Sequence, residues 1–528
     1  MRVFLLGIDG LTFRALDPLI ERGYLSRFAR LKQEGAWGIL RSTVPPITPA
    51  AWMSIATGLK PAKHGVLDFL DIEWLDNQIH LSMVTRRKSG QAIWDILSGY
   101  DRRVAVANVP CTYPPDAVNG VMVSGFSTPN LESTFTYPHT FQNALFKAVP
   151  GYQIDIVRTD QSEEYAGDEL LSLVQNMTDR RIELLDFIIE REAWDFVFFT
   201  IVGPDRIQHG FWDQIIEGHS PKIIAYYRTI DNVLARVMDW VGDDGLLLIV
   251  SDHGFRGTNR VCHINQLLGE RGLVEFKFPV RVKNLMVPLL EKLRLMKLMN
   301  FLYTMLVPQS NKGALASDRL LGPIAIDRSK MWALAYARSI YASLFCRPSS
   351  RDGTDDSLAA VIAELRDLNV ISDEVYTGEA LRTALGFGGE AWGPQAILIA
   401  NAPWAFQGRP RPGKITEITK PVGIHDMDGC LLAWGQGVKA GPLPESASVF
   451  DIVPTVLYAF DLPMESDFDG RPLADMFTFK RRIRVHDKMT GAVWEEAQQS
   501  DSVRKKLDKL LMKGSVREGD NSEKCNRS

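Results

Sequence analysis

The chain has 528 residues and a formal net charge of -4, and 45% of its residues are hydrophobic and 23% charged. The length exceeds what one hydrophobic core usually supports, so we expect several structural layers or an inserted domain. The composition is ordinary for a soluble globular protein. The small net charge gives no indication of a nucleic-acid polymer as a partner.

The five cysteines are far apart in the sequence and form no Cys-x-x-Cys pair. This spacing disfavours both a disulfide framework and a thiolate zinc site, and it favours a reducing compartment. The first apolar run is too short for a signal peptide, and the sequence has no run of about 18 apolar residues to span a bilayer. We therefore expect a cytoplasmic protein. The cysteines are Cys111, Cys262, Cys346, Cys430 and Cys525.

Short apolar runs alternate with helix-like stretches through the first half of the chain. This alternation predicts an α/β fold whose mostly parallel sheet is covered by helices on both faces. Asp9, Asp205 and Asp252 each follow such a run closely. Because ligands gather at the carboxyl ends of strands in open α/β folds, we expect these aspartates to converge at one sheet edge. The predicted strands are residues 3–8, 104–109, 121–124, 196–201 and 246–250.

A change of character after His253 predicts an insertion into this fold. The interval is rich in Leu and Met at 285–306 and is acidic and helix-like at 357–368. A strand-like run at 430–434 and a helix-like run at 450–460 then indicate that the core closes. The predicted domains are residues 1–255, the first part of the core; 256–415, an inserted cap; 416–479, the closing part of the core; and 480–528, a charged extension with one helix at 501–512 and a disordered end.

The segment 285–306 and the basic residues beside it allow two interpretations. Positive charge next to Leu and Met would suit an amphipathic helix on a membrane surface. On a helical period, however, Leu289, Leu293 and Leu298 fall around the whole cylinder, and Pro288 interrupts the start. We therefore expect this segment to pack in the cap or to contact a partner protein, with membrane contact as the alternative.

Thr48 is the candidate nucleophile. It is followed by Pro49, and the apolar stretch after it ends at Gly58, so the pattern predicts a helix with Thr48 as its N-cap. The start of a helix presents unpaired backbone N–H groups and the positive end of the helix dipole, which favour a bound phosphate. The alternative is that Thr48 only caps the helix, since hydroxyl caps are common.

Carboxylates and imidazoles at suitable spacings are the candidate metal ligands. Asp205 and His209 are four residues apart, which places both side chains on one face of a helix. Asp252 and His253 are adjacent and would serve one cation if the backbone turned sharply at Gly254.

Asp9 and His425 complete the set, although each alone also suits a structural role. An aspartate after a first strand is often a turn former, and a lone histidine is more often structural than a ligand. Together with Thr48, the ligands indicate a two-metal site for phosphoryl transfer, because divalent cations activate a hydroxyl and neutralise charge at phosphorus. The candidate residues are Asp9, Thr48, Asp205, His209, Asp252, His253 and His425.

The order of these residues resembles the alkaline phosphatase superfamily, and most closely its type I phosphodiesterase and nucleotide pyrophosphatase branch. The resemblance covers residues 1–253 and about 421–479. The motifs that carry it are Gly7-Ile-Asp-Gly10, Thr48 with Ala56-Thr-Gly-Leu59 and His64-Gly65, Pro204-Asp-Arg-Ile-Gln-His209, Ser251-Asp-His-Gly254, Gly423-Ile-His425, Asp451-Ile-Val-Pro-Thr455 and Asp469-Gly-Arg471.

The resemblance implies an alkaline-phosphatase-like fold with a cap, and a metal-dependent hydrolase of phosphodiester or pyrophosphate bonds. Thr48 would attack phosphorus and form a phosphothreonine intermediate, which water then hydrolyses. We expect two zinc ions, because the ligands are nitrogen and oxygen without thiolate, with manganese as the alternative. The implied ligands are Asp205, His209 and His425 for one cation, and Asp9, Asp252, His253 and Thr48 for the other.

Two positions depart from the branch and leave the substrate open beyond a small phosphorylated molecule. In nucleotide pyrophosphatases the residue after the nucleophile is often aromatic, but here it is Pro49. Phe69 lies near the position of a phosphate-contacting asparagine, and phenylalanine cannot donate a hydrogen bond. Nearby Trp52, Phe211 and Trp212 are expected in the core, with a substrate pocket as the alternative.

Other functions stay open as alternatives. A phosphomonoesterase would use the same residues, whereas related phosphomutases usually carry serine at the position of Thr48. Sulfatases need a modified cysteine or serine there. A catalytically weak, metal-stabilised binding protein is the alternative outside enzyme chemistry, but such a protein has no need of an open nucleophile. Nothing in the sequence indicates the oligomeric state.

Overall fold

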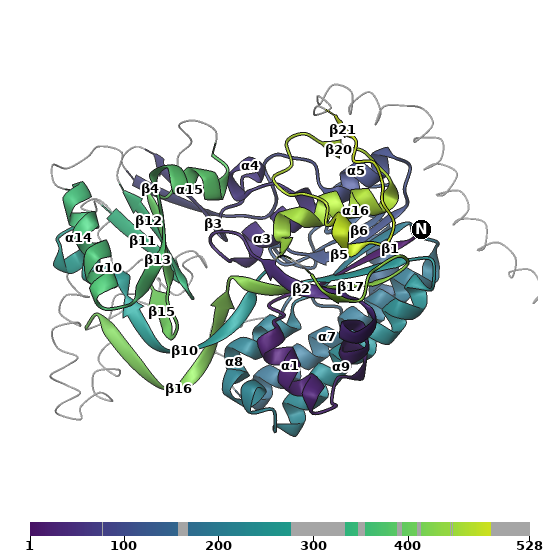
Figure 1. Ribbon diagram of the computed structural model, residues 1–528, viewed down its shortest axis with the longest axis horizontal. Helices are drawn as coiled ribbons and strands as arrows, with labels where there is room; N and C mark the ends of the chain where they lie inside the picture. Colours follow the sequence, from purple (N-terminus) through teal and green to yellow (C-terminus); the bar gives the residue numbers. More distant parts are fainter. Residues whose placement is uncertain are drawn as a thin grey trace, which may run out of the picture.

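The chain folds into a large core with a smaller cap beside it (Figure 1). The long strands β10 (Gly254–His263) and β16 (Ile415–Asp426) run between the two parts. In the described part of the chain, no helix combines the length and the apolar character that a bilayer span requires. The computed structural model describes residues 1–75, 78–156, 167–275, 333–346, 354–387, 393–408, 413–443, 445 and 447–486.

The core is built on a ten-stranded mixed sheet whose five central strands are parallel. The strand β17 joins this parallel set in the antiparallel direction. All five strands predicted in the first half of the chain are present, so the predicted α/β fold class is confirmed. In spatial order the sheet contains β18 (Gly441–Pro442), β2 (Ala36–Arg41), β17 (Asp428–Gly435), β9 (Leu246–Val250), β1 (Val3–Ile8), β8 (Phe196–Ile201), β5 (Val104–Val109), β6 (Gly120–Ser124) and β7 (Thr136–Tyr137), with β19 (Ala447–Ser448) beside β2.

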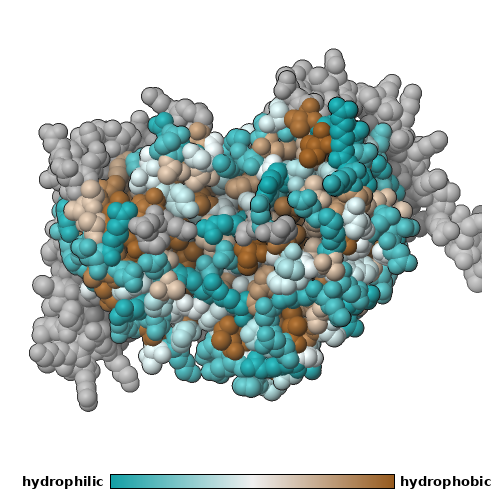
Figure 2. Space-filling view, viewed as in Figure 1, coloured by the Kyte–Doolittle hydropathy of each residue, from teal (hydrophilic) through white to brown (hydrophobic). Residues whose placement is uncertain are grey.

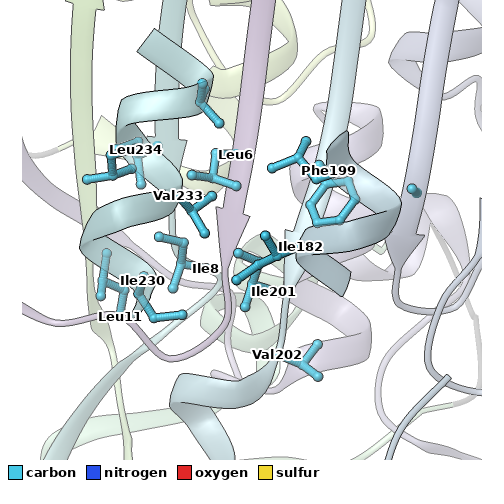
Figure 3. Close-up of a cluster of buried hydrophobic side chains, with 14 of the residues drawn as sticks. Leu6, Ile8, Leu11, Ile182, Phe199, Ile201, Val202, Ile230, Val233 and Leu234 are labelled. Carbon is cyan, nitrogen blue, oxygen red and sulfur yellow. The ribbon is translucent and has the colours of Figure 1, made fainter. Parts of the chain in front are cut away.

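Helices cover both faces of the sheet because the central strands carry apolar side chains on both faces. In β1, Leu6 and Ile8 pack with Phe199 of β8 in one cluster, while Val3 and Leu5 belong to the cluster on the opposite face. Figure 3 shows the first cluster between the strands and the helices. Helices with residues in this cluster are α1 (Phe13–Glu21), α2 (Ser26–Glu34), α6 (Phe141–Ala148), α7 (Asp168–Arg191), α8 (Gly203–Glu217) and α9 (Pro221–Val241); the other face has α3 (Thr48–Thr57), α5 (Ile93–Gly99) and α16 (Ile452–Phe460).

The cap contains a four-stranded antiparallel sheet of its own. The helix predicted at 357–368 is present as α14. The β10–β16 ladder crosses both predicted cap boundaries, because β10 begins at Gly254 and β16 ends at Asp426. The cap elements are β11 (Ala333–Arg338), β12 (Tyr341–Cys346), β14 (Ala396–Ala400), β13 (Ile371–Thr377), β15 (Trp404–Gln407), α10 (Ile264–Glu270), α14 (Thr354–Asp367) and α15 (Gly378–Leu385).

Smaller elements complete the described structure, and two predicted segments lie outside it. The segment 285–306 and the helix expected at 501–512 both fall outside the described residues. On the face in Figure 2, hydrophobic residues lie in separate small groups among hydrophilic ones. The remaining elements are α4 (Pro61–His64), the β3–β4 pair (Leu70–Leu75 and Gln78–Met83), the β20–β21 pair (Met464–Glu465 and Val485–His486), and two short 3-10 helices (Val449–Asp451 and Ala474–Met476).

Candidate metal centre and nucleophile

The candidate ligands meet at the carboxyl edge of the central sheet. Asp9 directly follows β1, and Asp252 and His253 follow the neighbouring strand β9. Asp205 lies in the first turn of α8, which starts just after β8 on the other side of β1. His425 reaches the same edge from β16 rather than from a loop before β17. The structure therefore brings the sequence-predicted ligands together, in two adjoining groups.

The first group consists of Asp9, Asp252 and His253 and is completely buried. The Nε2 atom of His253 lies 3.6 Å from Oδ1 of Asp9 and 3.3 Å from Oδ2 of Asp252. These two carboxylate oxygens have no hydrogen-bond partner among the described residues. The other oxygen of each carboxylate is satisfied, since Trp52 Nε1 donates to Asp9 at 3.2 Å and the Gly10 N–H donates to Asp252 at 3.1 Å.

The second group consists of Asp205, His209 and His425. Oδ1 of Asp205 lies 3.4 Å from Nε2 of His209 and 3.3 Å from Nε2 of His425, and the two Nε2 atoms are 3.2 Å apart. Oδ1 of Asp205 is also buried without a hydrogen-bond partner among the described residues. His209 is the open side of the centre, because its side chain is 41% exposed.

All three imidazoles turn the same nitrogen toward the centre. In each ring Nδ1 lies within hydrogen-bond distance of a backbone carbonyl, which can only accept. Nδ1 therefore carries the proton and Nε2 keeps its lone pair, as in metal-binding histidines oriented by a second hydrogen bond. The pairs are His209 with Gly423 O at 3.0 Å, His253 with Gly254 O at 3.1 Å, and His425 with Pro46 O at 3.2 Å.

The protonation preferences fit a cation site. Burial lowers the pKa of His253 well below its usual value and also lowers the pKa of His425, so both rings are neutral. Burial, together with repulsion between the carboxylates, raises the pKa of Asp9 and of Asp252 well above the usual value. Buried carboxylates in this state are unfavourable as anions unless a positive charge compensates them. The orphaned oxygens and the lone pairs of Nε2 therefore fit cation binding at these groups.

Thr48 occupies a position different from the predicted N-cap. The helix α3 starts at Thr48 itself, and Ile47, whose side chain cannot accept a hydrogen bond, is the N-cap. The Thr48 hydroxyl instead faces the first ligand group, with Oγ1 at 3.4 Å from Nε2 of His253. Gly58 ends the helix in the left-handed conformation, as the sequence predicts. The correction removes the purely structural explanation of Thr48, because its hydroxyl serves no cap.

Gly254 also acts differently from the sequence prediction. It does not form a sharp turn but starts the extended strand β10, which pairs antiparallel with β16. A Cβ atom at this position would lie 1.9 Å from the carbonyl oxygen of Asp428. The missing side chain therefore lets His253 approach the neighbouring strand, and close packing rather than backbone curvature requires the glycine.

The aromatic residues near the motifs belong to the core, as expected. Trp52 and Phe211 are buried in hydrophobic clusters, and Trp212 stacks on Phe255 with ring centroids 6.1 Å apart. Trp52 has an additional role that the sequence does not reveal, because its indole N–H orients Asp9. Phe69 packs edge-to-face on Phe126, with ring centroids 5.6 Å apart.

Two further side chains act on the ligands and were not predicted. Arg206 donates to Oδ2 of Asp205 at 2.6 Å. Ser339, in the turn between β11 and β12 of the cap, accepts a hydrogen bond from the His425 backbone N–H at 2.8 Å. Arg206 lies in the motif Pro204-Asp-Arg-Ile-Gln-His209, so a positive charge next to the ligand Asp205 could have been recognised from the sequence. Ser339 lies 86 residues before its partner, and no local sequence pattern connects them.

Solved structures with the same fold include hydrolases of phosphorus compounds. Phosphonoacetate hydrolase from Sinorhizobium meliloti 1021, in complex with phosphonoformate, is 16% identical with a TM-score of 0.55, covering 86% of this chain and 94% of its own. Murine ectonucleotide pyrophosphatase/phosphodiesterase 5, in an inactive form with AMP, is 10% identical with a TM-score of 0.52. The match covers 90% of this chain and 100% of the murine chain. The human counterpart is 12% identical with a TM-score of 0.52, and the match covers 91% of this chain and 100% of the human chain.

The solved structures support the alkaline-phosphatase-like fold, and the sequence comparison gives the family. No curated protein matches the chain. Residues 3–428 match the family model described as type I phosphodiesterase / nucleotide pyrophosphatase, and this range includes all seven candidate residues. The chain therefore belongs to the type I phosphodiesterase/nucleotide pyrophosphatase family.

Proposed function

We propose that this protein is a metal-dependent hydrolase of phosphodiester or pyrophosphate bonds that acts through a phosphothreonine intermediate. The observation that carries the proposal is the hydroxyl of Thr48, which caps no helix and lies 3.4 Å from Nε2 of His253 at the edge of two ligand groups. A nucleophile beside two such groups suits an in-line displacement at phosphorus.

We propose two divalent cations at these groups, zinc first and manganese as the alternative. Mixed nitrogen and oxygen donors without thiolate suit zinc, and they do not exclude manganese. When bound, such cations lower the pKa of a coordinated hydroxyl and stabilise negative charge on the reacting oxygens. The residues that would hold them are Asp205, His209 and His425 for one, and Asp9, Asp252, His253 and Thr48 for the other.

The residues around Thr48 determine how a phosphate can approach. The start of α3 directs backbone N–H groups and the positive end of its dipole toward a phosphate next to Thr48, although Pro49 contributes no N–H. Access is from the side of His209, since the other ligands and Thr48 are nearly or completely buried.

The reaction then has two balanced steps. In the first, the Thr48 oxygen forms a bond to phosphorus while the bond from phosphorus to the leaving oxygen breaks, and the hydroxyl proton is transferred to the departing group. In the second, a water oxygen attacks the same phosphorus and the bond to Thr48 breaks, which regenerates the hydroxyl. A small phosphorylated molecule suits this centre, and the family match supports a diester or a pyrophosphate as the substrate class.

Hydrolysis assays on the full chain test the proposal. The metal-free protein, supplied with Zn²⁺ or Mn²⁺, is assayed with bis-p-nitrophenyl phosphate as a diester and p-nitrophenyl phosphate as a monoester. We expect faster turnover of the diester, with Thr48→Ala inactive and Thr48→Ser partly active. Faster turnover of the monoester would favour the phosphomonoesterase alternative. If neither ester is hydrolysed, or if Thr48→Ala hydrolyses them as fast as the unaltered protein, the proposed function is wrong.

A further inference from the structure

Arg206 joins two carboxylates next to the open ligand group. Its Nη1 donates to Oδ2 of Asp205 at 2.6 Å, and its Nη2 donates to Oδ2 of Asp155 at 2.8 Å. The side chain is 21% exposed, and its guanidinium lies over the ring of Phe126 at 5.7 Å from the ring centroid. Two hydrogen bonds and one aromatic face thus fix the guanidinium on three sides.

The guanidinium keeps its charge in this position. An arginine side chain stays protonated in proteins, and the two carboxylates that accept its hydrogen bonds favour the charged form. An arginine can bridge two carboxylates because its donors form a rigid planar fork, whereas a lysine presents a single point charge. Asp155 is thus joined to Asp205 through Arg206, since its Oδ2 accepts a hydrogen bond from the guanidinium.

The contact leaves Asp205 with one oxygen for a cation. Oδ2 is occupied by Arg206, and Oδ1 is the buried orphan that faces the Nε2 atoms of His209 and His425. In the buried group the corresponding oxygens of Asp9 and Asp252 are held by neutral donors, an indole and a backbone amide. Asp205 is thus the ligand carboxylate that a full positive charge orients.

We propose that Arg206, anchored by Asp155, is a positioning residue that restricts Asp205 to a single metal-facing oxygen in the Asp205, His209 and His425 site. The proposal rests on the metal-dependent function proposed above. Without Arg206, the Asp205 carboxylate is free to rotate and loses the orientation that brings Oδ1 to both imidazoles. The buried group of Asp9, Asp252 and His253 has its own hydrogen-bond donors, and the bridge acts on it only through the charges near Asp9.

Charge and positioning predict opposite effects of removing Arg206, which makes the proposal testable. By charge alone, loss of a cation next to Asp205 strengthens the attraction for a metal ion. By positioning, Arg206→Gln weakens binding, because loss of an outer contact to a metal ligand typically costs about 10-fold to 100-fold in affinity. The sign of the change in zinc affinity therefore separates the two effects.

The test measures zinc affinity of the full chain by competition with a chelator, without reference to turnover. His209→Ala first identifies which of the binding steps belongs to this site. We expect Arg206→Gln to weaken that step by at least about 10-fold and not to weaken the other step, at which Arg206 acts only through its charge. Arg206→Lys restores part of the affinity, and Asp155→Asn weakens the same step less than Arg206→Gln does, because it removes the anchor and not the contact.

Arg14→Gln is the matched control. Arg14 pairs with Asp426, which is next to a metal ligand in the sequence, but it touches no ligand carboxylate. We expect this variant to keep both affinities. Circular dichroism and thermal unfolding of the metal-free protein identify variants that fail to fold. If Arg206→Gln fails to fold, the zinc affinity of Arg206→Lys decides whether Arg206 is a positioning residue, because this variant keeps the charge but not the planar fork of donors.

An unchanged or a raised affinity in Arg206→Gln overturns the positioning role, and so does an equal loss in Arg14→Gln. If the unaltered protein binds zinc but hydrolyses no ester, the proposed function fails while the affinity series still decides the role of Arg206. Absence of both zinc and manganese binding in the unaltered protein removes both proposals.

Discussion

The two ligand groups of the centre differ in burial and in the elements that build them. Asp9, Asp252 and His253 are buried and follow two adjacent parallel strands of the core. Asp205 and His209 lie on a helix, His209 is largely exposed, and His425 belongs to a strand that continues into the cap. The first group is thus fixed by the central sheet, and the second by the contacts of α8 and β16.

This difference suggests a division of work. The buried group lies beside Thr48, so in the proposed mechanism it would hold the nucleophile in a buried position. The open group reaches the surface at His209, and it makes contacts with side chains outside the sheet, namely Arg206 and Ser339. Changes to the buried group should therefore affect chemistry and folding together, whereas changes to the open group should affect metal affinity with less effect on the fold.

Removal of the nucleophile should have the largest effect. We expect Thr48→Ala to lower kcat by at least about 1000-fold, because the covalent step is lost, while Asp9, Asp252 and His253 still hold the cation of the buried group. Thr48→Ser keeps a hydroxyl at the same position and serves as the control. Mass spectrometry of the chain quenched during turnover should detect a phosphoryl adduct on Thr48. Adduct formation on another residue would contradict the assignment of the nucleophile.

Substitution of one ligand from each group tests the division directly. We expect Asp252→Asn and His209→Ala each to weaken zinc binding by at least about 100-fold at its own site, more than loss of an outer contact typically costs. Their effects on the metal-free protein should differ. Asp252→Asn removes a buried carboxylate whose pKa is raised by burial, so it should raise the stability of the metal-free chain at neutral pH.

His209→Ala removes an exposed ring and should leave the stability of the metal-free chain nearly unchanged. Thermal unfolding with and without a chelator measures both variants. Equal changes in the two metal-free proteins would show that burial does not distinguish the groups.

The loss of stability of the metal-free protein at low pH tests the effect of a buried histidine that binds no cation. His64 is buried outside both ligand groups, lies 3.0 Å from the Ser54 hydroxyl, and has its pKa lowered by burial from 6.5 to about 3. Below pH 6.5 the unfolded chain binds a proton that the folded chain does not bind until about pH 3. The contribution of His64 to the free energy of unfolding is therefore fully present above pH 6.5. As the pH falls from 6.5 toward 3, this contribution decreases by about 1.4 kcal/mol per pH unit.

We expect His64→Gln to reduce this slope in the metal-free protein. Chemical denaturation at several pH values between 6.5 and 5 measures it, with the exposed His219→Gln as the control. A slope unchanged by His64→Gln would assign the acid sensitivity to the ligand groups instead.

The sequence predicts the buried group better than the open group, and the reason is physical. A strand that ends in Asp or in Asp-His is a local pattern, and the parallel arrangement of the strands brings these ends together without further information. The Asp205 and His209 pair is also local, since helical spacing places both on one face. The pairing of β10 with β16, which brings His425 to this edge, joins segments about 170 residues apart and leaves no local signature.

The conformational details around these residues were less predictable. Thr48 as first helical residue instead of N-cap is a shift of one position, within the uncertainty of helix ends. The close approach at Gly254 depends on the carbonyl of Asp428 in a strand far along the chain. A glycine in a sequence shows that a side chain is absent, but not whether curvature or packing is the cause.

Loss of the cap contact to the open group should have the smallest effect. In Ser339→Ala the backbone N–H of His425 loses its acceptor, which costs about 1 kcal/mol in the free energy of unfolding. The positive φ of 59° at residue 339 is equally unfavourable for Ser and Ala, so the comparison reports the hydrogen bond. We expect a several-fold weaker zinc affinity at the open site and no change at the buried site. The control Ser172→Ala removes an exposed hydroxyl on α7 that bonds only to its own helix. An effect of Ser339→Ala on the buried site would show that the cap acts on both groups through β10, which leaves the core directly after His253.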